Sequence, residues 1–167
     1  LIEEKGWMVM PPIPYSYNTI IRDLTSPAPS SPSKKNWLGT DDQARDVLSR
    51  LIYGFRISVL FGFTLTFFSM VIGVTAGSIQ GYFGGKTDLF FQRFMEVWSA
   101  IPTLYVLIIL ASVIQPNFWW LLIILLLFSW MGYVGVVRAE FLRARNFDYI
   151  RAAKALGVSD TKIMLKH

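Results

Sequence analysis

The stretch Ile57–Gly85, which reads ISVLFGFTLTFFSMVIGVTAGSIQGYFGG, contains no charged side chain. An α-helix rises about 1.5 Å per residue, so about 20 apolar residues cross the roughly 30 Å hydrocarbon core of a bilayer. The stretch is therefore long enough and apolar enough to predict one membrane-spanning helix, at about residues 57–80. We expect the chain to be an integral membrane protein.

A second uncharged stretch, Val97–Val137, is about twice as long as one span requires. It is interrupted by Gln115-Pro116-Asn117, and a proline inside a helix removes a hydrogen bond and clashes with the preceding turn. The stretch therefore predicts two further spans, Phe94–Ile114 and Phe118–Val137. Residues 57–137 thus predict three transmembrane helices in an all-α, polytopic transmembrane helical bundle.

The composition argues against catalytic chemistry. Of the 167 residues, 53% are hydrophobic and 16% are charged, against about 25% charged residues in a soluble domain. There is no cysteine, and the single histidine is His167. We therefore expect no disulfide, no thiolate nucleophile and no histidine-based site. The prediction is a chain that is not an enzyme and has no catalytic residue, metal site or bound cofactor.

Basic residues are unevenly distributed around the predicted spans, and the cytoplasmic loops of membrane proteins are enriched in lysine and arginine. The residues before the first span contribute Arg45, Arg50 and Arg56. The opposite side contributes seven: Lys86, Arg93, Arg138, Arg143, Arg145, Arg151 and Lys154. This imbalance predicts a cytoplasmic C-terminal segment and an external, periplasmic N-terminal segment.

The segment before the first span is expected to divide into a loop and a helix. Residues 1–36 are rich in proline and serine and predict a periplasmic loop with little regular structure. Residues 37–56 predict an amphipathic, interfacial helix that leads into the span, with Thr40 or Asp41 as its N-cap. The acidic cluster of Asp41, Asp42 and Asp46 suits capping and the positive end of the helix dipole better than it suits a cation.

Small residues repeat every four positions in the first span, at Gly73, Gly77 and Gly81. Such spacing places them on one face of a helix and lets a second helix backbone approach closely. The pattern predicts helix packing there, either within one subunit or between two.

The last thirty residues are basic and polar, and they predict two short helices joined by a glycine turn. Asn146-Phe147-Asp148 interrupts the helix that leaves the membrane, and Gly157 suits a left-handed helix end. Ser159 or Asp160 is expected to cap the second short helix. Apolar residues available for one face are Ile150, Ala153, Leu156, Ile163 and Met164. Two interpretations remain open: a hairpin that lies on the anionic inner leaflet, or a projection that docks a cytoplasmic partner.

Several motifs together resemble the inner-membrane permeases of bacterial ABC importers. Arg151–Gly157, RAAKALG, is similar to the EAA loop of that family, E-A-A-x-x-x-G, with arginine in place of the glutamate. Leu38–Asp41 and Arg45–Gly54 are similar to the oligopeptide and dipeptide branch, and the resemblance extends over about residues 36–167. Ala44 stands where that branch often has glycine, a change expected to matter little in a helix.

The resemblance implies a type I (MetI-like) permease with six spans, one before and two after the three in this chain. It implies the following partners: a homologous second permease, two cytoplasmic ABC ATPase subunits or domains, a periplasmic peptide-binding protein, a peptide substrate and the lipid bilayer of the bacterial inner membrane. Nucleic acid is not among them. ATP and Mg²⁺ would be used by the ATPases, and the cargo would be oligopeptides, microcin C-like peptides among them.

The resemblance also assigns site residues. The loop expected to couple to the ATPase contains Tyr149, Arg151, Ala152, Ala153, Leu156 and Gly157. Ala153 and Gly157 are expected to sit in the docking groove. Asp41, Asp42 and Arg45 are expected to contact the binding protein.

The competing interpretation is a membrane channel without energy coupling or a structural membrane subunit. A channel would be expected to carry a filter or a charged constriction, and the sequence indicates neither. The chain begins at Leu1 without an initiator methionine and stops within an amphipathic stretch. We therefore expect it to be an interior piece of a longer protein.

Overall fold

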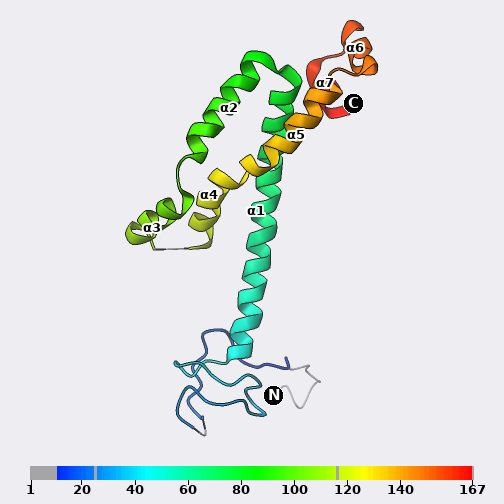
Figure 1. The fold of residues 1–167 in the computed structure, drawn as a ribbon. Helices are drawn as coiled ribbons and strands as arrows, with labels where there is room; N and C mark the ends of the chain where they lie inside the picture. Colours follow the sequence, from blue (N-terminus) through cyan, green and yellow to red (C-terminus); the bar gives the residue numbers. More distant parts are fainter. Residues whose placement is uncertain (1–10, 25, 116, 167) are drawn as a thin grey trace. The chain divides into compact units, whose positions relative to one another are not determined.

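The structure is a computed structural model that describes residues 11–24, 26–115 and 117–166. Within these ranges the chain forms seven helices and no β-strand beyond two isolated bridges. The helices, shown in Figure 1, are α1 Val47–Phe83, α2 Gly85–Ser99, α3 Thr103–Val113, α4 Phe118–Ser129, α5 Met131–Ala144, α6 Asp148–Ala155 and α7 Asp160–Lys166. The predicted all-α class is confirmed. The chain divides into two units, Leu1–Leu60 and Phe61–His167, and each is described by itself.

Among the described residues, two helical stretches are long and apolar enough to cross a membrane alone, namely α1 and the near-continuous α4–α5 stretch Phe118–Ala144. Helices α2 and α3 together make a third candidate span, bent by 58° between them. The expectation of one continuous helix over Phe94–Ile114 is therefore wrong. The break falls just before Pro102, whose ring disfavours a helical conformation in the residue before it.

Helix α1 begins at Val47, later than the predicted N-caps Thr40 and Asp41. The cap is Asp46, whose Oδ2 accepts the backbone N–H of Ser49 at 2.7 Å. The predicted helix over residues 37–56 is thus wrong in its first half, because residues 41–46 form a turn. Its second half is not a separate element, since α1 continues to Phe83 without a break.

Ala44 lies in this turn with φ 58°, in the left-handed region that favours glycine. The expectation that alanine matters little here assumed a helix, and it is wrong. The described part of residues 11–36 contains no helix or strand, and it is attached to the turn by hydrogen bonds such as Ile21 N–H to the Ala44 carbonyl, 2.9 Å.

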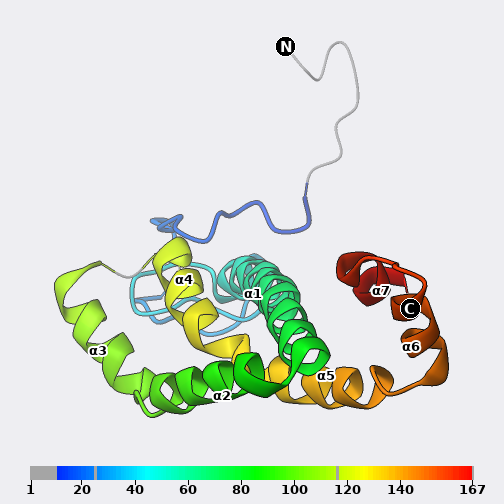
Figure 2. The same ribbon diagram turned by 90° about the horizontal axis from the view of Figure 1, so that it is seen from above.

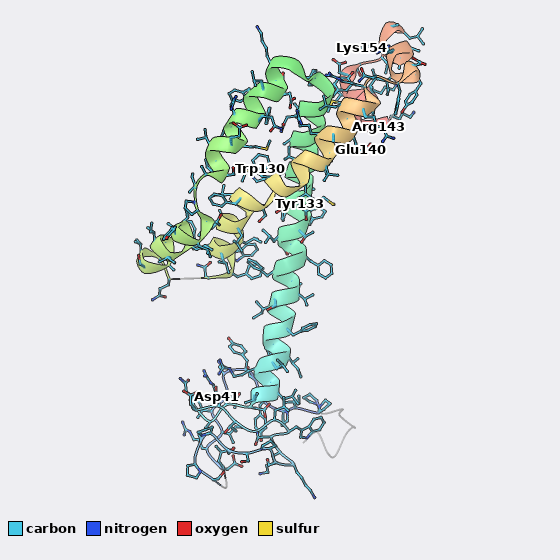
Figure 3. All side chains as sticks on the ribbon, in the orientation of Figure 1. Asp41, Trp130, Tyr133, Glu140, Arg143 and Lys154 are labelled. Atoms are coloured by element: carbon cyan, nitrogen blue, oxygen red, sulfur yellow. The ribbon has the colours of Figure 1, made fainter. Side chains whose placement is uncertain are left out.

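In the second unit, α1 packs closely against α5. A Cβ added to Gly77 would lie 2.8 Å from the Val134 carbonyl oxygen, too close for any side chain. Gly73 and Gly81 face the same helix one turn to either side. Figure 3 labels Trp130 and Tyr133, which lie opposite Gly73 on this stretch of the chain. The packing predicted from the glycine repeat thus occurs within this chain.

Trp98 connects α2 to the junction of α4 and α5. Its indole N–H donates to the Leu127 carbonyl at 3.0 Å, and the Trp130 indole donates to the same oxygen at 3.0 Å. The turn at Trp130 leaves this carbonyl available at the end of α4, and an unpaired carbonyl in an apolar setting is costly. The two indoles therefore stabilise the junction.

Candidate coupling surface

Helices α6 and α7 form a hairpin that follows α5, and both ribbon views place them side by side (Figure 2). Gly157 has φ 78° and ends α6 as the sequence predicts. Its N–H donates to the Lys154 carbonyl at 3.1 Å, and the Val158 N–H donates to the Ala153 carbonyl at 3.1 Å. This pair of bonds is a Schellman motif, in which a left-handed glycine satisfies the last carbonyls of a helix.

One face of the hairpin is buried against the end of α1. Tyr82, Ile150 and Ile163 form a cluster in which each side chain is less than a tenth exposed. Partly buried residues packed against it are Phe141, Ala153, Val158 and Met164. Burying two isoleucine side chains stabilises the hairpin by about 1.5–3 kcal/mol each. The hairpin is thus anchored to the membrane helices by its own apolar core.

The opposite face of the hairpin is exposed and contains large side chains. Leu156 is 83% exposed and Leu165 is 85% exposed, while Tyr149 is 52% exposed and lies beside Phe147, ring centroids 5.7 Å apart. The expected apolar face is therefore wrong in one member, because Leu156 points away from Ile150 and Ile163. Leu156 follows the last residue of α6, so the helical spacing that would place it on the face of Ile150 no longer applies.

The structure separates the six residues expected at the ATPase into two groups. Five are exposed: Tyr149, Arg151, Ala152, Leu156 and Gly157. Ala153 is half-buried and packs on the cluster of its own chain. That Ala153 and Gly157 sit in the docking groove stays a prediction, and the exposed five define the candidate coupling surface.

An ion pair that no pattern in the sequence indicates connects α2 to α5. Arg138 donates to both oxygens of Asp88, from Nε at 2.5 Å and from Nη2 at 2.6 Å. Such bidentate pairing is geometrically specific. Nearby in sequence, Gln80 on α1 is fully buried and accepts a hydrogen bond from Gln92 on α2 at 3.4 Å. Asp88 and Arg138 both lie near the edges of the uncharged stretches, but they are 50 positions apart in the sequence.

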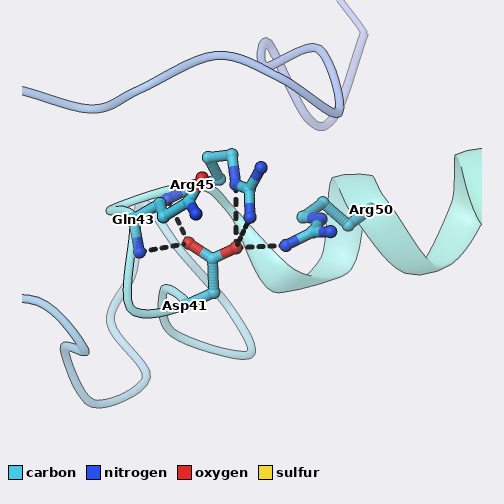
Figure 4. A network of polar contacts seen from close by, with 4 residues as sticks. All are labelled: Asp41, Gln43, Arg45 and Arg50. Carbon is cyan, nitrogen blue, oxygen red and sulfur yellow. Dashed lines mark hydrogen bonds and ion pairs between the residues drawn. The ribbon is translucent and has the colours of Figure 1, made fainter.

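In the first unit, Asp41 is the centre of a polar network. Its carboxylate accepts the backbone N–H groups of Gln43 and Arg45, each at 2.9 Å, and the Arg45 Nε at 2.8 Å (Figure 4). Arg50 pairs with the same oxygen as the Arg45 side chain. Partial burial of this carboxyl acts to raise its pKa, but the hydrogen bonds stabilise the charged form and hold the pKa of Asp41 well below its usual range.

Two of the three residues expected at the binding protein are thus engaged within the chain. Asp41 and Arg45 are partly buried and bound to each other, whereas Asp42 is exposed. A second network, missed from sequence, lies beside them: Asn36 Nδ2 donates to Asp46 Oδ1 at 2.9 Å, and both side chains are buried. The Leu38–Asp46 stretch therefore has an internal, structural role.

Comparison with known proteins agrees with the architecture. Residues 69–167 match the family described as binding-protein-dependent transport system inner membrane component. The chain is 61% identical to the inner membrane ABC transporter permease protein YejE of Escherichia coli K12, over 99% of this chain and 49% of that protein.

Two further relatives are named for the cargo of their transport systems. The peptidoglycan transport system permease protein YejE of Agrobacterium fabrum is 54% identical, over 99% of this chain and 50% of that protein. The oligopeptide transport system permease protein OppC of Haemophilus influenzae is 35% identical, over 92% and 49%. The chain spans about half the length of the curated relatives it matches. With its apolar helices, the close α1–α5 contact and the hairpin after the last of them, it belongs to the family of inner membrane components of binding-protein-dependent transport systems.

Proposed function

We propose that this chain is part of the permease subunit of an ATP-driven importer, and that the exposed face of its α6–α7 hairpin docks an ATPase on the cytoplasmic side. The observation that supports this most directly is Leu156, an 83% exposed leucine beside a left-handed glycine on a well-anchored hairpin. Burying such a side chain in a partner is worth about 1.5–3 kcal/mol. The exposed Tyr149 and Arg151 are of the types that dominate interfaces.

In this proposal the hairpin moves with the ATPase. Closure of the ATPases on ATP would displace the hairpin, and the attached spans would shift between two arrangements. ATP and Mg²⁺ would be bound by the partner subunits and not by this chain, which would catalyse no reaction. A homologous second permease would complete the pathway, and a periplasmic binding protein would deliver the cargo to the N-terminal side.

The proposed cargo is an oligopeptide, on the strength of the relatives named for oligopeptide transport. A second candidate is a peptidoglycan fragment, because the relative at 54% identity is named for peptidoglycan transport. Uptake of labelled oligopeptides and of labelled peptidoglycan fragments by the same cells distinguishes the two. A channel without energy coupling would pass cargo after the ATPases are removed, whereas the proposed permease would not.

The experiment is a comparison of Gly157→Val with Gly157→Asn in the complete transporter. Valine is strained at φ 78° and would distort the turn, while asparagine tolerates this conformation. We expect Gly157→Val to lose ATPase co-purification and cargo uptake while it still inserts in the membrane, and Gly157→Asn to keep both. Normal cargo-stimulated ATP hydrolysis in Gly157→Val would contradict the proposal.

A further inference from the structure

A hydrogen bond joins the end of the first span to the last helix of the hairpin. Tyr82 lies one residue before the end of α1, and its hydroxyl donates to Asp160 Oδ1 at 2.5 Å. Asp160 is the first residue of α7, 78 positions later in the chain. Tyr82 is 8% exposed, so its ring is held by packing and its hydroxyl has little freedom to turn to water.

Lys154 brings α6 into the same contact. Its Nζ lies 3.8 Å from Asp160 Oδ1 and 5.4 Å from the centroid of the Tyr82 ring. The ion pair is solvent-exposed and is worth little by itself. The three side chains come from α1, α6 and α7, so the contact joins both helices of the hairpin to one span (Figure 3 shows Lys154 on the hairpin).

The chemistry of this contact makes it directional. A hydrogen bond from a hydroxyl to a carboxylate is roughly twice as strong as a hydrogen bond between neutral groups. It weakens with small changes in length or angle. The apolar contacts beside it, from Ile150 and Ile163, are non-directional and permit sliding. A displacement of the hairpin therefore either carries α1 with it or breaks the Tyr82–Asp160 bond.

From this geometry we propose that Tyr82 is a positioning residue that couples hairpin movement to the first span, with Asp160 as its acceptor. The proposal rests on the proposed function, since it says how docking at the exposed face would be transmitted inward. Tyr82 is 8% exposed, and in this proposal it acts through the hairpin. Loss of its hydroxyl would leave the ATPases bound and active. The spans would then change arrangement in fewer of the ATPase cycles.

The test measures cargo transported per ATP hydrolysed in the complete reconstituted transporter. Tyr82→Phe keeps the ring and its packing and removes only the hydroxyl. We expect the ratio to fall about tenfold, the change that losing a hydrogen bond to a charged group produces. Tyr105→Phe is the matched control: Tyr105 is exposed on α3, and its hydroxyl has no hydrogen bond to any residue that the structure describes. It should leave the ratio unchanged.

Two variants of the acceptor separate coupling from folding. Asp160→Asn keeps an oxygen that accepts the hydroxyl and should keep most of the ratio, while Asp160→Ala should lower it as Tyr82→Phe does. The double variant Tyr82→Phe/Asp160→Ala should lower the ratio no further than either single variant, because each single variant already removes the same hydrogen bond. The ratio is taken per assembled complex, so a lower yield does not imitate uncoupling.

A wild-type ratio in assembled Tyr82→Phe transporter would overturn the inference, as would additive losses in the double variant. Failure of the proposed function looks different. In that case the wild-type complex would show no ATP hydrolysis in response to cargo.

Discussion

The polar segments on either side of the apolar helices use their charged residues in opposite ways. Before α1, the Asp41 carboxylate accepts four donors from its own segment, and Asp46 is 1% exposed with both of its oxygens hydrogen-bonded. After α5, the hairpin keeps Arg151 and Leu156 at its surface. Both segments carry family-like motifs, but the aspartates of the first are bound within the chain, whereas Arg151 and Leu156 of the second are exposed.

A charged motif thus indicates a structural or a binding role only after its hydrogen bonds are known. Buried polar groups must find partners, and Asp41 and Asp46 find theirs within residues 36–50. Exposed apolar groups without partners point instead to an interface. Each of the following predictions tests one side of this contrast, in order of decreasing effect.

The largest expected effects come from two apolar truncations on the hairpin. Ile163→Ala removes a side chain that is 2% exposed and should lower the free energy of unfolding by about 2–4 kcal/mol. Leu156→Ala should leave that free energy unchanged within about 0.5 kcal/mol and weaken ATPase association at least about tenfold. Thermal unfolding and co-purification measure the two quantities. Equal effects of the two variants on stability would remove the contrast between the faces.

A second pair of variants compares two aspartates of the N-terminal segment. Asp46→Ala leaves the Asn36 amide and the Ser49 N–H without their partner and should destabilise the segment by about 2–3 kcal/mol. Asp42→Ala, at an exposed site, should change stability by less than about 0.5 kcal/mol. Hydrogen exchange of residues 36–50 reports the local free energy. Equal protection in both variants would show that the buried network is dispensable.

Ala44→Gly should stabilise the same segment. Alanine in the left-handed region costs about 1–2 kcal/mol, and the greater freedom of glycine in the unfolded chain offsets part of the gain, leaving about 0.5–1 kcal/mol. Ala139→Gly, at an exposed position inside α5, should destabilise its helix by about 1 kcal/mol. The opposite signs make the comparison independent of any general effect of glycine. Hydrogen exchange at both sites provides the measurement.

The smallest effect appears only in acid. The folded pKa of Asp41 is depressed below its unfolded value of 3.8, so its stabilising contribution is complete above that pH and is lost as the pH falls below it. Pepsin cleavage within residues 39–46 should therefore rise between about pH 4 and pH 2 in the wild type more than in Asp41→Asn. Comparing the two proteins at each pH removes the pH dependence of pepsin itself. Parallel curves would mean that Asp41 contributes no acid-sensitive stability.

Much of the fold followed from the sequence, because uncharged length and glycine spacing are local signals. The spans of α1 and Phe118–Ala144, the Gly157 turn and the face of Gly73 could all be predicted that way. The helix start at Val47 could not, because Asp41 and Asp46 both suit an N-cap and only tertiary partners decide between them.

The site was less predictable than the fold. The exposed residues of the hairpin were named from a motif, but the motif did not indicate that Ala153 packs against the cluster around Ile150. The Tyr82–Asp160 bond joins residues 78 positions apart, and no local pattern indicates it. Such contacts depend on how helices meet, which neither periodicity nor composition specifies.

Single-cysteine labelling in whole cells tests whether the hairpin is cytoplasmic and docks an ATPase, because none of the 167 residues is a cysteine. Asp42→Cys should react with a membrane-impermeant maleimide in cells whose inner membrane is intact. Leu156→Cys should react only after that membrane is opened, and a cross-linker attached there should capture an ATPase subunit. Labelling of Leu156→Cys in intact cells, or its failure to capture an ATPase under conditions where the complex is assembled, would contradict a cytoplasmic hairpin that docks an ATPase.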